Sequence, residues 1–341
     1  MNICKQWDCL PKIVTDRLND ANVFFSEEYS EYTLARGERV YFFYDETYIV
    51  PLRVKKVLFI SAGVFDTEPF CYNAVDSGER EQAFIDNVCL CMHTISVAWV
   101  VTAQSSSFNV FPNNSIYAPR GNLIIDLELS EEELFTNVHS KHRNSIRRAE
   151  KNGVVISNDC SDEAVNKYAL MERETYGRSK QYGSGTRYYQ KIADTFSDYA
   201  DFVFAYKDFE PQAAGVFFYN TVMGYYMHGA SINHPEPGAA NLLLWSELMK
   251  LKAEGVKKFN FVGYGLYVEE GSKYEGIQRF KERFGGQLVK CFNFRYVSNE
   301  VLFSLYKCIC QLRKGRLFTK YEDNIDVQYK KYMSEKENKG E

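Results

Sequence analysis

One helical segment of the sequence places a lysine where it could stabilise developing negative charge. In residues 275–286, EGIQRFKERFGG, helical spacing puts Ile277, Phe280 and Phe284 on one face, and Lys281 lies beside that face. An ammonium group that follows a buried phenylalanine can reach into a cleft as a point charge, which is useful where an oxyanion forms. The simpler interpretation is a solvated helix face that ends at a glycine pair.

A second segment could bind an anion through the main chain. A strand ends near Gly229, a loop with two prolines follows, and a helix opens at the small residues Gly238, Ala239 and Ala240. The first N–H groups of a helix have no partner inside it, so such a start can hold a phosphate. An ordinary strand-to-helix connection, which needs proline and glycine for its turn, is the alternative interpretation.

Two further side chains could take part in the same chemistry. Arg178, at the end of a helix, could hold a phosphate or carboxylate through two parallel hydrogen bonds, although a surface arginine is the commoner outcome. His228 follows Tyr225 and Tyr226 on the strand and could act as a base, although a single histidine there is usually packed or hydrogen-bonded.

Several other catalytic classes lack their sequence signals. The sequence contains no Gly-x-Ser-x-Gly elbow, no Gly-Lys-Ser/Thr phosphate loop and no His-Glu-x-x-His motif, which argues against a serine hydrolase, a P-loop enzyme and a zinc protease. The nine cysteines form no CxxC pair, so we expect core thiols in a reduced, cytoplasmic protein and no bound metal. The opening residues lack the apolar core of a signal peptide, and residues 88–103 are too short an apolar stretch to cross a bilayer. We therefore expect no stable membrane insertion.

The elements that must position these residues follow the order of an α/β protein with a mixed sheet. In the second half we expect helices over residues 161–176, 186–196, 241–254 and 275–284, and strands over residues 202–206, 212–220, 221–230, 258–262 and 288–297. A last helix over residues 300–313 precedes a polar tail that we expect to fray.

The first half is mixed and parallels the second in element order. We expect helices over residues 26–36 and 78–92, and strands over residues 40–44, 48–55, 97–103 and 123–127. A helix with a Ser-x-x-Glu capping box begins at Ser130, becomes basic in its later part and ends at Asn152-Gly153. Because strand, turn and strand recur in the two halves, the chain could be a duplication of one fold.

The composition fits a folded protein large enough for two domains. The chain has 341 residues, of which 45% are hydrophobic and 25% charged, and its net charge is −4. Residues 1–100 hold 9 basic and 15 acidic side chains, whereas residues 257–320 hold 13 basic and 5 acidic ones. Non-specific nucleic-acid binding by the whole protein is therefore not expected, and an anionic ligand should meet the second half. Solvated helix faces are the alternative explanation.

Three separate segments of the sequence carry a family resemblance. They are SKHRNSIRRAEKNGV at 140–154, GAANLLLWSELMKLKAEGVKKFNFVGYG at 238–265 and EGIQRFKERFGGQLV at 275–289. Together, and in this order, they resemble the Fem family, the non-ribosomal peptidyl transferases that attach amino acids to peptidoglycan precursors. The resemblance implies an α/β (α+β) fold of two acetyltransferase-like (GNAT) lobes, each a mixed twisted sheet flanked by helices.

The resemblance also implies how the chain divides. Residues 1–135 would form the first lobe, residues 136–298 the catalytic lobe, residues 299–320 a helix that returns to the first lobe, and residues 321–341 a polar tail. No long coiled-coil insertion is visible between the two helices of residues 161–196. The chain is therefore similar to the compact members of the family, which lack that arm as a tRNA contact.

Functional residues of the family carry over to matching positions. Lys281 matches the lysine proposed to stabilise the tetrahedral intermediate, and Phe280 shapes the site beside it. Arg178 stands where the family has an arginine that contacts the phosphates of the acceptor. Tyr225 and Tyr226 lie on the strand that borders the acceptor channel.

One position departs from the family pattern. The opening helix of the family often bears a lysine four residues after an aromatic residue, and that position, counted from Tyr29, is Thr33 here. Arg36, on the next turn, could replace this lysine. The departure weakens the case for a nucleotide-linked muropeptide acceptor.

The resemblance implies acyl transfer to an amine. The activated carbonyl would lie near Tyr226 and Gly229, and Lys281 or a main-chain N–H would stabilise its oxygen. His228 or a chain of waters could take the proton, or the amine could arrive already neutral. We expect no bound cofactor, a monomer or weak dimer, and an amine acceptor on an anionic cell-wall, envelope or sugar-nucleotide precursor.

Two co-substrates stay open as the donor. An acyl-CoA donor predicts a pyrophosphate at Gly238, Ala239 and Ala240, although only Pro237-Gly238-Ala239 approximates the usual CoA signature. An aminoacyl-tRNA donor predicts RNA binding by a basic surface that comprises Lys257, Lys258, Arg279, Arg283 and the cluster at 313–320. A non-catalytic double-GNAT module that binds a sugar-nucleotide or a partner protein is the alternative from another class.

Overall fold

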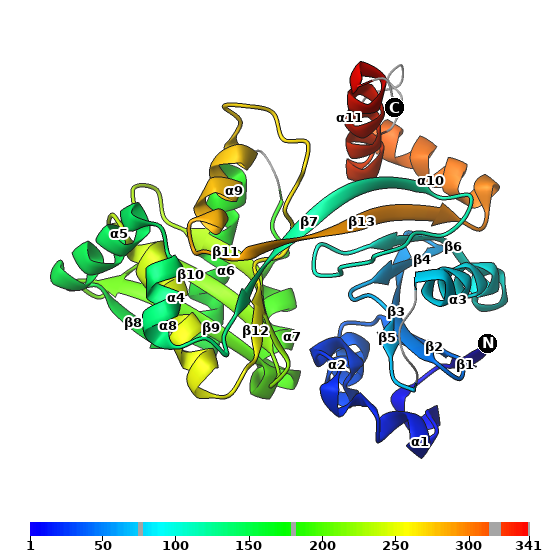
Figure 1. The fold of residues 1–341 in the computed structure, drawn as a ribbon, viewed down its shortest axis with the longest axis horizontal. Helices are drawn as coiled ribbons and strands as arrows, with labels where there is room; N and C mark the ends of the chain where they lie inside the picture. The colour runs from blue at the N-terminus through cyan, green and yellow to red at the C-terminus, as the bar shows by residue number, and fades with distance from the viewer. Residues whose placement is uncertain (74–77, 179–181, 314–321, 340–341) are drawn as a thin grey trace. The chain divides into compact units, whose positions relative to one another are not determined.

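The computed structural model describes residues 1–73, 78–178, 182–313 and 322–339 and divides the chain into two compact units (Figure 1). Unit 1 comprises Met1–Asn122, Gly263–Glu269 and Val289–Glu341, and unit 2 comprises Leu123–Val262 and Glu270–Leu288. The predicted border after residue 135 lies inside a helix of unit 2. Each unit has a mixed sheet flanked by helices, and the predicted α/β fold class is confirmed.

The strands of unit 1 follow the order β1-β2-β3-β4-β6-β13, with β4 and β6 parallel and the other neighbours antiparallel. They are β1 (Asn2–Cys4), β2 (Arg39–Tyr44), β3 (Tyr48–Val57), β4 (Ile60–Phe65), β6 (Val97–Thr102) and β13 (Gln287–Val297), which begins in unit 2, and β5 (Phe70–Cys71) pairs with β3. The helices are α1 (Lys12–Thr15), α2 (Glu27–Ala35), α3 (Gly78–Leu90), α10 (Glu300–Arg313) and α11 (Asn324–Lys339), with 3₁₀ turns at Trp7–Cys9, Leu18–Asp20, Val23–Phe25 and Cys91–Ile95.

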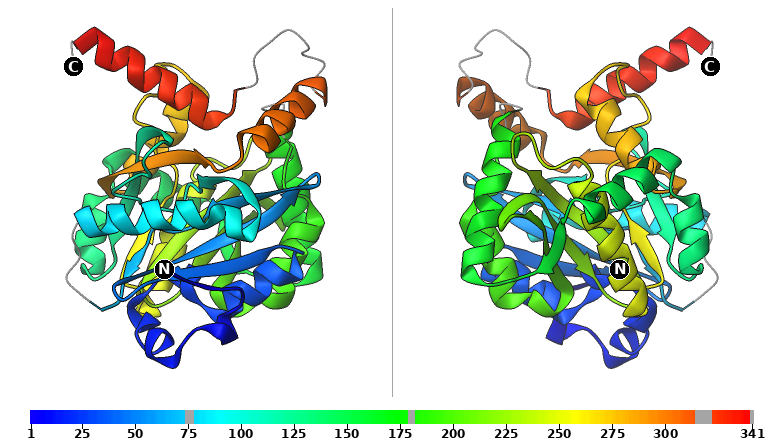
Figure 2. Two further views of the ribbon diagram at one scale, coloured as in Figure 1. Left: turned by 90° about the vertical axis from the view of Figure 1, so that its right-hand side faces the viewer. Right: turned by 90° about the vertical axis from the view of Figure 1, so that its left-hand side faces the viewer.

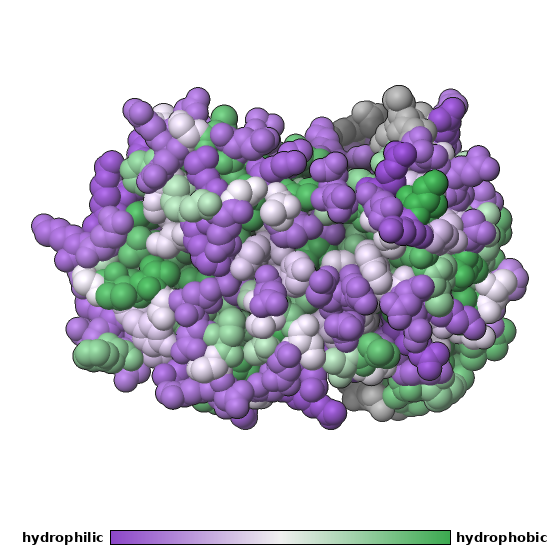
Figure 3. Space-filling model, turned by 90° about the horizontal axis from the view of Figure 1, so that it is seen from below, coloured by the Kyte–Doolittle hydropathy of each residue, from purple (hydrophilic) through white to green (hydrophobic). Residues whose placement is uncertain are grey.

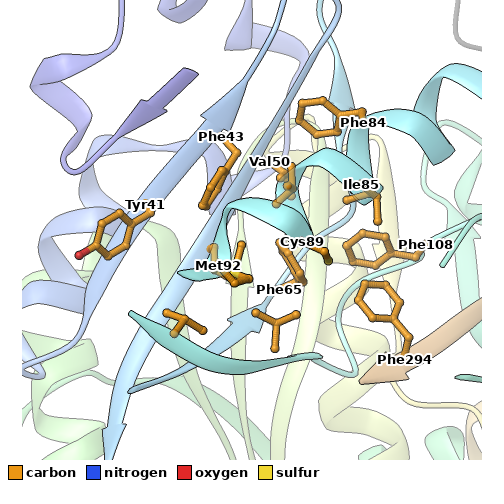
Figure 4. Close-up of a cluster of buried hydrophobic side chains, with 14 of the residues drawn as sticks. Tyr41, Phe43, Val50, Phe65, Phe84, Ile85, Cys89, Met92, Phe108 and Phe294 are labelled. Atoms are coloured by element: carbon orange, nitrogen blue, oxygen red, sulfur yellow. The ribbon is translucent and has the colours of Figure 1, made fainter. Parts of the chain in front are cut away.

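The core of unit 1 combines aromatic and aliphatic side chains. Phe84 and Ile85 of α3 pack in one buried cluster with Phe65 of β4 and Phe294 of β13 (Figure 4). Phe108, from the segment between β6 and β7, belongs to the same cluster. The ring centroids of Phe108 and Phe294 lie 5.0 Å apart in an edge-on contact, which aromatic pairs favour.

α10 packs on β6 through a second cluster of unit 1. The ring of Trp99 lies 5.3 Å from the ring of Phe303 and 4.7 Å from that of Tyr306, measured between centroids. The helix predicted over residues 300–313 is therefore present, and it packs on the first lobe.

The strands of unit 2 follow the order β7-β12-β11-β10-β9-β8, with β11 and β12 parallel. They are β7 (Ile116–Asp126), which begins in unit 1, β8 (Val155–Asn158), β9 (Ala200–Lys207), β10 (Glu210–Tyr219), β11 (Met223–Ser231) and β12 (Lys258–Asn260). The helices are α4 (Glu131–Asn137), α5 (Ser140–Lys151), α6 (Asp162–Gly177), α7 (Thr186–Thr195), α8 (Ala239–Ala253) and α9 (Lys273–Glu282), with a 3₁₀ turn at Ser197–Tyr199.

The single helix predicted from Ser130 to Asn152 is wrong, because two helices occupy this stretch. The predicted capping box is present, with Ser130 and Glu133 bonded to each other's main-chain N–H. Val138, however, is extended (φ −65°, ψ 129°) and buried, which ends α4. His139 then caps α5, because its Nδ1 accepts the N–H of Lys141 at 3.1 Å.

The polar tail predicted to fray after residue 321 is also wrong for the residues that the structure describes. α11 begins at Asn324 and is anchored to β13 of unit 1 (Figure 2). Arg295 of β13, which is 4% exposed, pairs with Asp323 at 2.5 Å and with Asp326 at 2.6 Å. A polar sequence is thus ordered through a buried cation.

Replacing Arg295 with alanine should release α11 and destabilise unit 1. The change leaves two partly buried carboxylates without their cation, and removing one partner of such a pair typically costs about 3 kcal/mol or more. Urea unfolding and limited proteolysis of residues 322–339 would measure the effect. Lys330→Ala, which removes an exposed pair with Glu322, is the matched control and should cost under about 1 kcal/mol. Equal midpoints for both variants would contradict the anchoring role.

Candidate functional site

Two neighbouring strands of unit 2 part where the sequence analysis placed the reacting carbonyl. The parallel ladder of β11 and β12 ends at the pair Tyr225 and Asn260. β11 continues to Ser231, whereas the chain after β12 stays with β7, because the N–H of Phe261 donates to the carbonyl of Leu123. Beyond Tyr225, β11 therefore has no ladder to β12.

β11 also carries a bulge at the point of parting. The register against β10 shifts between the pair Val216 and His228 and the pair Phe217 and Tyr226. The ring of Tyr226 stacks on Phe217 with centroids 5.2 Å apart and meets Phe261 edge-on at 6.3 Å. Burial raises the pKa of Tyr226 to about 12, which keeps its phenol protonated. Aromatic rings and one phenol thus lie beside the parted strands.

The two tyrosines that were predicted together face opposite sides of the sheet. Tyr225 pairs with Phe218 and is 2% exposed, whereas Tyr226 pairs with Phe217, and successive strand residues alternate in direction. Gly229 leaves room for the Tyr226 phenol, because a Cβ at this position would collide with its oxygen. Of the pair, only Tyr226 lies on the side of Phe217 and Gly229.

Lys281 lies on α9 with its ammonium group turned inward. Its Nζ donates a hydrogen bond of 2.6 Å to the carbonyl oxygen of Val262, two residues beyond the end of β12. The prediction of a shared buried face on this helix is wrong for Ile277, which is 41% exposed, whereas Phe284 is buried and Phe280 is half-buried. The amphipathic pattern indicated the helix, but its packed face is narrower than predicted.

Desolvation lowers the pKa of Lys281 to about 8. Burial disfavours the charged form of an amine, and no carboxylate contributes to the shift. The amine is therefore mostly protonated at neutral pH, but its pKa is close to that pH. Such a lysine can donate a hydrogen bond to a developing oxyanion.

The carbonyl that accepts this bond belongs to a strained residue. Val262 has a φ of 45°, a region that β-branched residues avoid. Asn260, which is 1% exposed, holds it there, because its Oδ1 accepts the N–H of Val262 at 2.7 Å. Strain of this kind costs on the order of 1–3 kcal/mol and is concentrated at functional sites. Sequence reasoning missed both residues, and the available signal was an asparagine between Phe259 and Phe261.

α5 and α4 fix the position of the lysine helix within unit 2. His142 Nε2 lies 3.0 Å from the carbonyl oxygen of Phe280, and burial lowers the pKa of His142 to about 4, so the neutral ring donates this bond. The His142 ring also meets Phe284 edge-on with centroids 4.9 Å apart. Gly285, at φ 84°, allows close approach, because a Cβ there would lie 2.6 Å from the carbonyl oxygen of Asn137.

His228 is hydrogen-bonded on the other side of the sheet from Tyr226. Its Nε2 lies 3.0 Å from the hydroxyl of Tyr188 on α7, and the two rings meet edge-on. The adjacent Tyr189 is bonded to the buried carboxylate of Glu172 on α6. The structure therefore joins His228 to a polar cluster of α6 and α7, and its role as a base stays a prediction.

Arg178 lies at the carboxyl end of β11. Its Nη2 donates to the carbonyl oxygen and the hydroxyl of Ser231, both at 3.1 Å, and to Thr175 Oγ1 at 3.3 Å. The side chain is exposed, and a guanidinium has further N–H donors beyond this nitrogen. The arginine thus secures the strand end and retains donors for an anion.

The predicted donor-binding start of α8 packs against α5. A side chain at Gly238, whose φ is 91°, would collide with the main chain of Ser145, and Ala239 is 1% exposed. Ala240 is half-buried. The amide nitrogen of Asn241 is buried without a hydrogen-bond partner among the described residues. Phosphate binding at this helix start stays a prediction.

Arg36 belongs to unit 1 and is part of an ionic network there. Its guanidinium donates to the hydroxyl of Tyr32 at 3.0 Å and to Glu38 at 3.2 Å. Arg53 in turn bridges Glu38 and the buried Asp66 at 2.8 and 2.6 Å. The network holds Arg36 in place, and its contact with an acceptor stays a prediction.

A surface hollow of about 480 Å³ in unit 2 has none of the predicted site residues in its lining. It runs along α4, α5 and α8, where it is lined by Glu131, Glu132, Phe135, Ile146, Arg147, Glu150 and Trp245.

The basic surface predicted to bind RNA is described only in part. Lys257, Lys258 and Arg279 are exposed, Arg283 is half-buried, and Arg279 pairs with Glu275 at 2.5 Å. The cluster at 313–320 lies outside the side chains that the structure describes.

The described residues hold no group of three or more metal-ligating side chains. Across the same described ranges, no helix combines the length and the apolar character needed to span a membrane. All nine cysteines are free thiols.

Comparisons with known proteins agree with the fold. Residues 108–213 match the model of the FemAB family. A comparison with curated proteins finds no match. The crystal structure of FemX aligns with a TM-score of 0.66 at 13% sequence identity, over 89% of this chain and 99% of that one.

Two further solved structures share the fold. One is the DUF2156 C-terminal domain of a lysylphosphatidylglycerol synthetase candidate from Agrobacterium fabrum, with a TM-score of 0.55 at 12% identity over 88% of this chain and 96% of that one. The other is L-PGS from Bacillus licheniformis, with a TM-score of 0.51 at 15% identity over 86% of this chain and 93% of that one. The matched segment and the shared fold confirm the predicted resemblance to the Fem family.

Proposed function

We propose that this protein is an acyltransferase that moves an aminoacyl or acyl group onto an amine of a cell-wall or envelope precursor. The observation that carries the proposal is the desolvated ammonium of Lys281, which is held beside the point where β11 and β12 part. The FemAB segment and the fold of FemX support the reaction class.

The proposed reaction has a balanced course. The amine nitrogen of the acceptor attacks the carbonyl carbon of the donor, and the carbonyl oxygen becomes negatively charged. The attack forms a C–N bond, which is kept. The ester C–O bond of an aminoacyl-tRNA, or the thioester C–S bond of an acyl-CoA, then breaks. The nitrogen loses a proton and the leaving oxygen or sulfur gains one.

Lys281 would act on the charged intermediate. One of its three N–H donors goes to the carbonyl of Val262, which leaves two for the oxyanion. A donor that is already positioned and desolvated stabilises such charge better than water does, because no reorganisation is needed. The Tyr226 phenol, which stays protonated, is a second candidate donor.

His228 is the candidate proton acceptor. Its hydrogen bond with Tyr188 fixes the ring, and the tyrosine hydroxyl could pass the proton on. Since His228 and Tyr226 face opposite sides of β11, a water would have to connect this histidine with the reacting nitrogen. Arg178, which is hydrogen-bonded to Ser231 at the end of the same strand, is the proposed contact for an anionic acceptor in unit 2. Arg36 stays a separate candidate in unit 1.

An aminoacyl-tRNA is the donor that we favour. The start of α8 packs against α5 at Gly238, where a Cβ would collide with the main chain of Ser145. One observation favours acyl-CoA as the second candidate: the unpartnered amide of Asn241 lies in the first turn of α8, where it could donate to a phosphate.

Replacing Lys281 with methionine should lower the transfer rate on the order of 10²- to 10³-fold, because one oxyanion donor is lost. Single-turnover transfer with a saturating donor would measure the effect, and donor binding should change little. Phe209→Ser, at an exposed turn of unit 2, is the control. Normal turnover by Lys281→Met would remove the proposed role.

The pH dependence of transfer should identify the protonated lysine. Since the pKa of Lys281 is about 8, the ammonium is lost as the pH rises through 8, and the rate should fall there. Lys281→Arg, whose side chain stays charged, should lose this alkaline limb even if its overall rate is lower. An unchanged limb in Lys281→Arg would assign the titration to another group.

Replacing Asn260 with alanine should change the surroundings of Lys281 and leave the lysine itself in the sequence. The N–H of Val262 loses its acceptor, the strained turn relaxes, and the ammonium loses the carbonyl that holds it in a desolvated place. We expect the pKa of Lys281 to rise above about 8, which NMR titration of ¹³C-labelled lysine can follow. Asn158→Ala, which removes a bond to Asp201 elsewhere in unit 2, should leave that pKa unchanged. Identical titrations of wild type and Asn260→Ala would contradict this positioning.

Binding assays should distinguish the two donors. We expect purified protein to retain aminoacyl-tRNA on filters with an affinity that falls steeply with salt, and not to bind immobilised CoA. Transfer of a labelled aminoacyl group to an amine acceptor would then test the reaction itself. Binding to CoA alone would move the assignment to the acyl-CoA reaction, and binding to neither would favour a non-catalytic module.

A further inference from the structure

The surface hollow among α4, α5 and α8 of unit 2 takes no part in the proposed reaction. Its volume of about 480 Å³ is within the range of small-molecule sites in proteins. Each of two helices turns three residues at helical spacing toward it: Glu131, Glu132 and Phe135 from α4, and Ile146, Arg147 and Glu150 from α5. The chemistry of these side chains, together with Trp245 of α8, decides what the hollow can hold.

The less exposed part of the lining is aromatic. Phe135 is half-buried, and its ring centroid lies 4.9 Å from that of Trp245, which is 9% exposed. The guanidinium carbon of Arg147 lies 5.2 Å from the centroid of Phe135. A cation this close to a ring is attracted by its electrons, and tryptophan attracts cations most strongly. The contact of Arg147 therefore shows that an organic cation fits against this part of the hollow.

The exposed part of the lining is acidic. Glu131, Glu132 and Glu150 are exposed, and none of them forms an ion pair with a residue that the structure describes. Arg147 is the one basic residue of the lining, so the hollow carries a net charge of −2. Acidic residues in the first turn of α4 stabilise that helix, but Glu150 lies near the end of α5, where a negative charge is unfavourable. Helix stability therefore does not explain Glu150.

We propose that this hollow binds an organic cation, namely an ammonium or guanidinium group on an apolar stem. The stem would lie against Phe135 and Trp245, and the positive charge would lie among the three glutamates. A free amine and the lysine side chain of a partner protein present this same chemistry, and the test below separates these two sources.

Other occupants use fewer features of the hollow. A metal ion is a poorer occupant, because the described residues hold no group of three or more side chains that could bind one, and aromatic rings offer it no ligand. A nucleic acid or an anionic lipid would be repelled by the net charge of −2. A neutral apolar molecule would use the rings but none of the carboxylates. An organic cation uses both.

Fluorine NMR of the full chain labelled with 5-fluorotryptophan tests this proposal without donor or acceptor, so its result is independent of the proposed transfer reaction. The sequence contains three tryptophans, of which Trp7 and Trp99 belong to unit 1, and Trp245→Phe assigns the third resonance. Hexylamine should shift the Trp245 resonance alone. Hexanol, which has the same stem without the charge, should bind about tenfold more weakly, and hexanoate should cause no shift.

A blocked Ala-Ala-Lys-Ala-Ala peptide, acetylated and amidated at its ends, identifies the source of the cation. Binding of the peptide that is tighter than that of hexylamine would assign the hollow to a lysine of a partner protein. Weaker binding of the peptide would assign it to a free amine, because the peptide backbone then only adds to the cost of ordering the ligand.

The double variant Glu132→Gln, Glu150→Gln removes one carboxylate from each helix and keeps the shape of both side chains. We expect it to bind hexylamine about fivefold less tightly or weaker. Glu163→Gln, which removes an exposed glutamate of α6, is the matched control and should leave the titration unchanged. Thermal unfolding of each variant would show that the fold is retained, as expected for exposed positions. An unmoved Trp245 resonance, equal binding of hexylamine and hexanol, or wild-type binding by the double variant would overturn the proposal.

Discussion

The buried ammonium of Lys281 is the constraint on which the arrangement of unit 2 depends. A charged amine is costly to desolvate, and here a single main-chain carbonyl, that of Val262, compensates for part of the lost hydration. That carbonyl is available only because Val262 is held in a strained conformation by Asn260. The lysine is in turn aimed by α9, which His142 ties to α5. Three segments, the turn at residues 260–262, α9 and α5, thus keep one cation desolvated.

The same asparagine also explains why the strands part. β12 is a short strand, and its last residue uses its side chain to capture the N–H of Val262, which a further ladder would have needed. The chain then leaves β11 and follows β7, so β11 continues without its parallel neighbour. A bulge at the same level of β11 adds to the divergence, as bulges do near functional sites. Parting strands and a carbonyl aimed at Lys281 are therefore two consequences of one local turn.

Seen from below, the molecule shows apolar residues in separate patches between hydrophilic ones (Figure 3).

Local signals predicted most elements of this fold, and tertiary contacts decided the rest. The capping box at Ser130 and the helix of Lys281 could be predicted, because side chains within one turn determine them. The break at Val138 could not, since it depends on burial and on a bond from His139 to the carbonyl of Arg283, far along the chain. For the same reason the order of α11, which rests on Arg295, was missed. In the site, Lys281 was found from its pattern, whereas Asn260 was not, because its role is visible only in the turn that it forms.

The choice of lysine at position 281 follows from this geometry. An arginine carries five N–H donors in a rigid plane and stays protonated, so a single carbonyl would leave most of its donors unsatisfied in a buried place. A lysine satisfies one donor with the Val262 carbonyl and presents the others on a compact group, which an incoming oxyanion can approach. Its pKa of about 8 means that the charge is present at neutral pH but weakly stabilised. A group whose charge is weakly stabilised in the resting protein gains most when negative charge develops beside it, which is the condition for preferential stabilisation of a transition state.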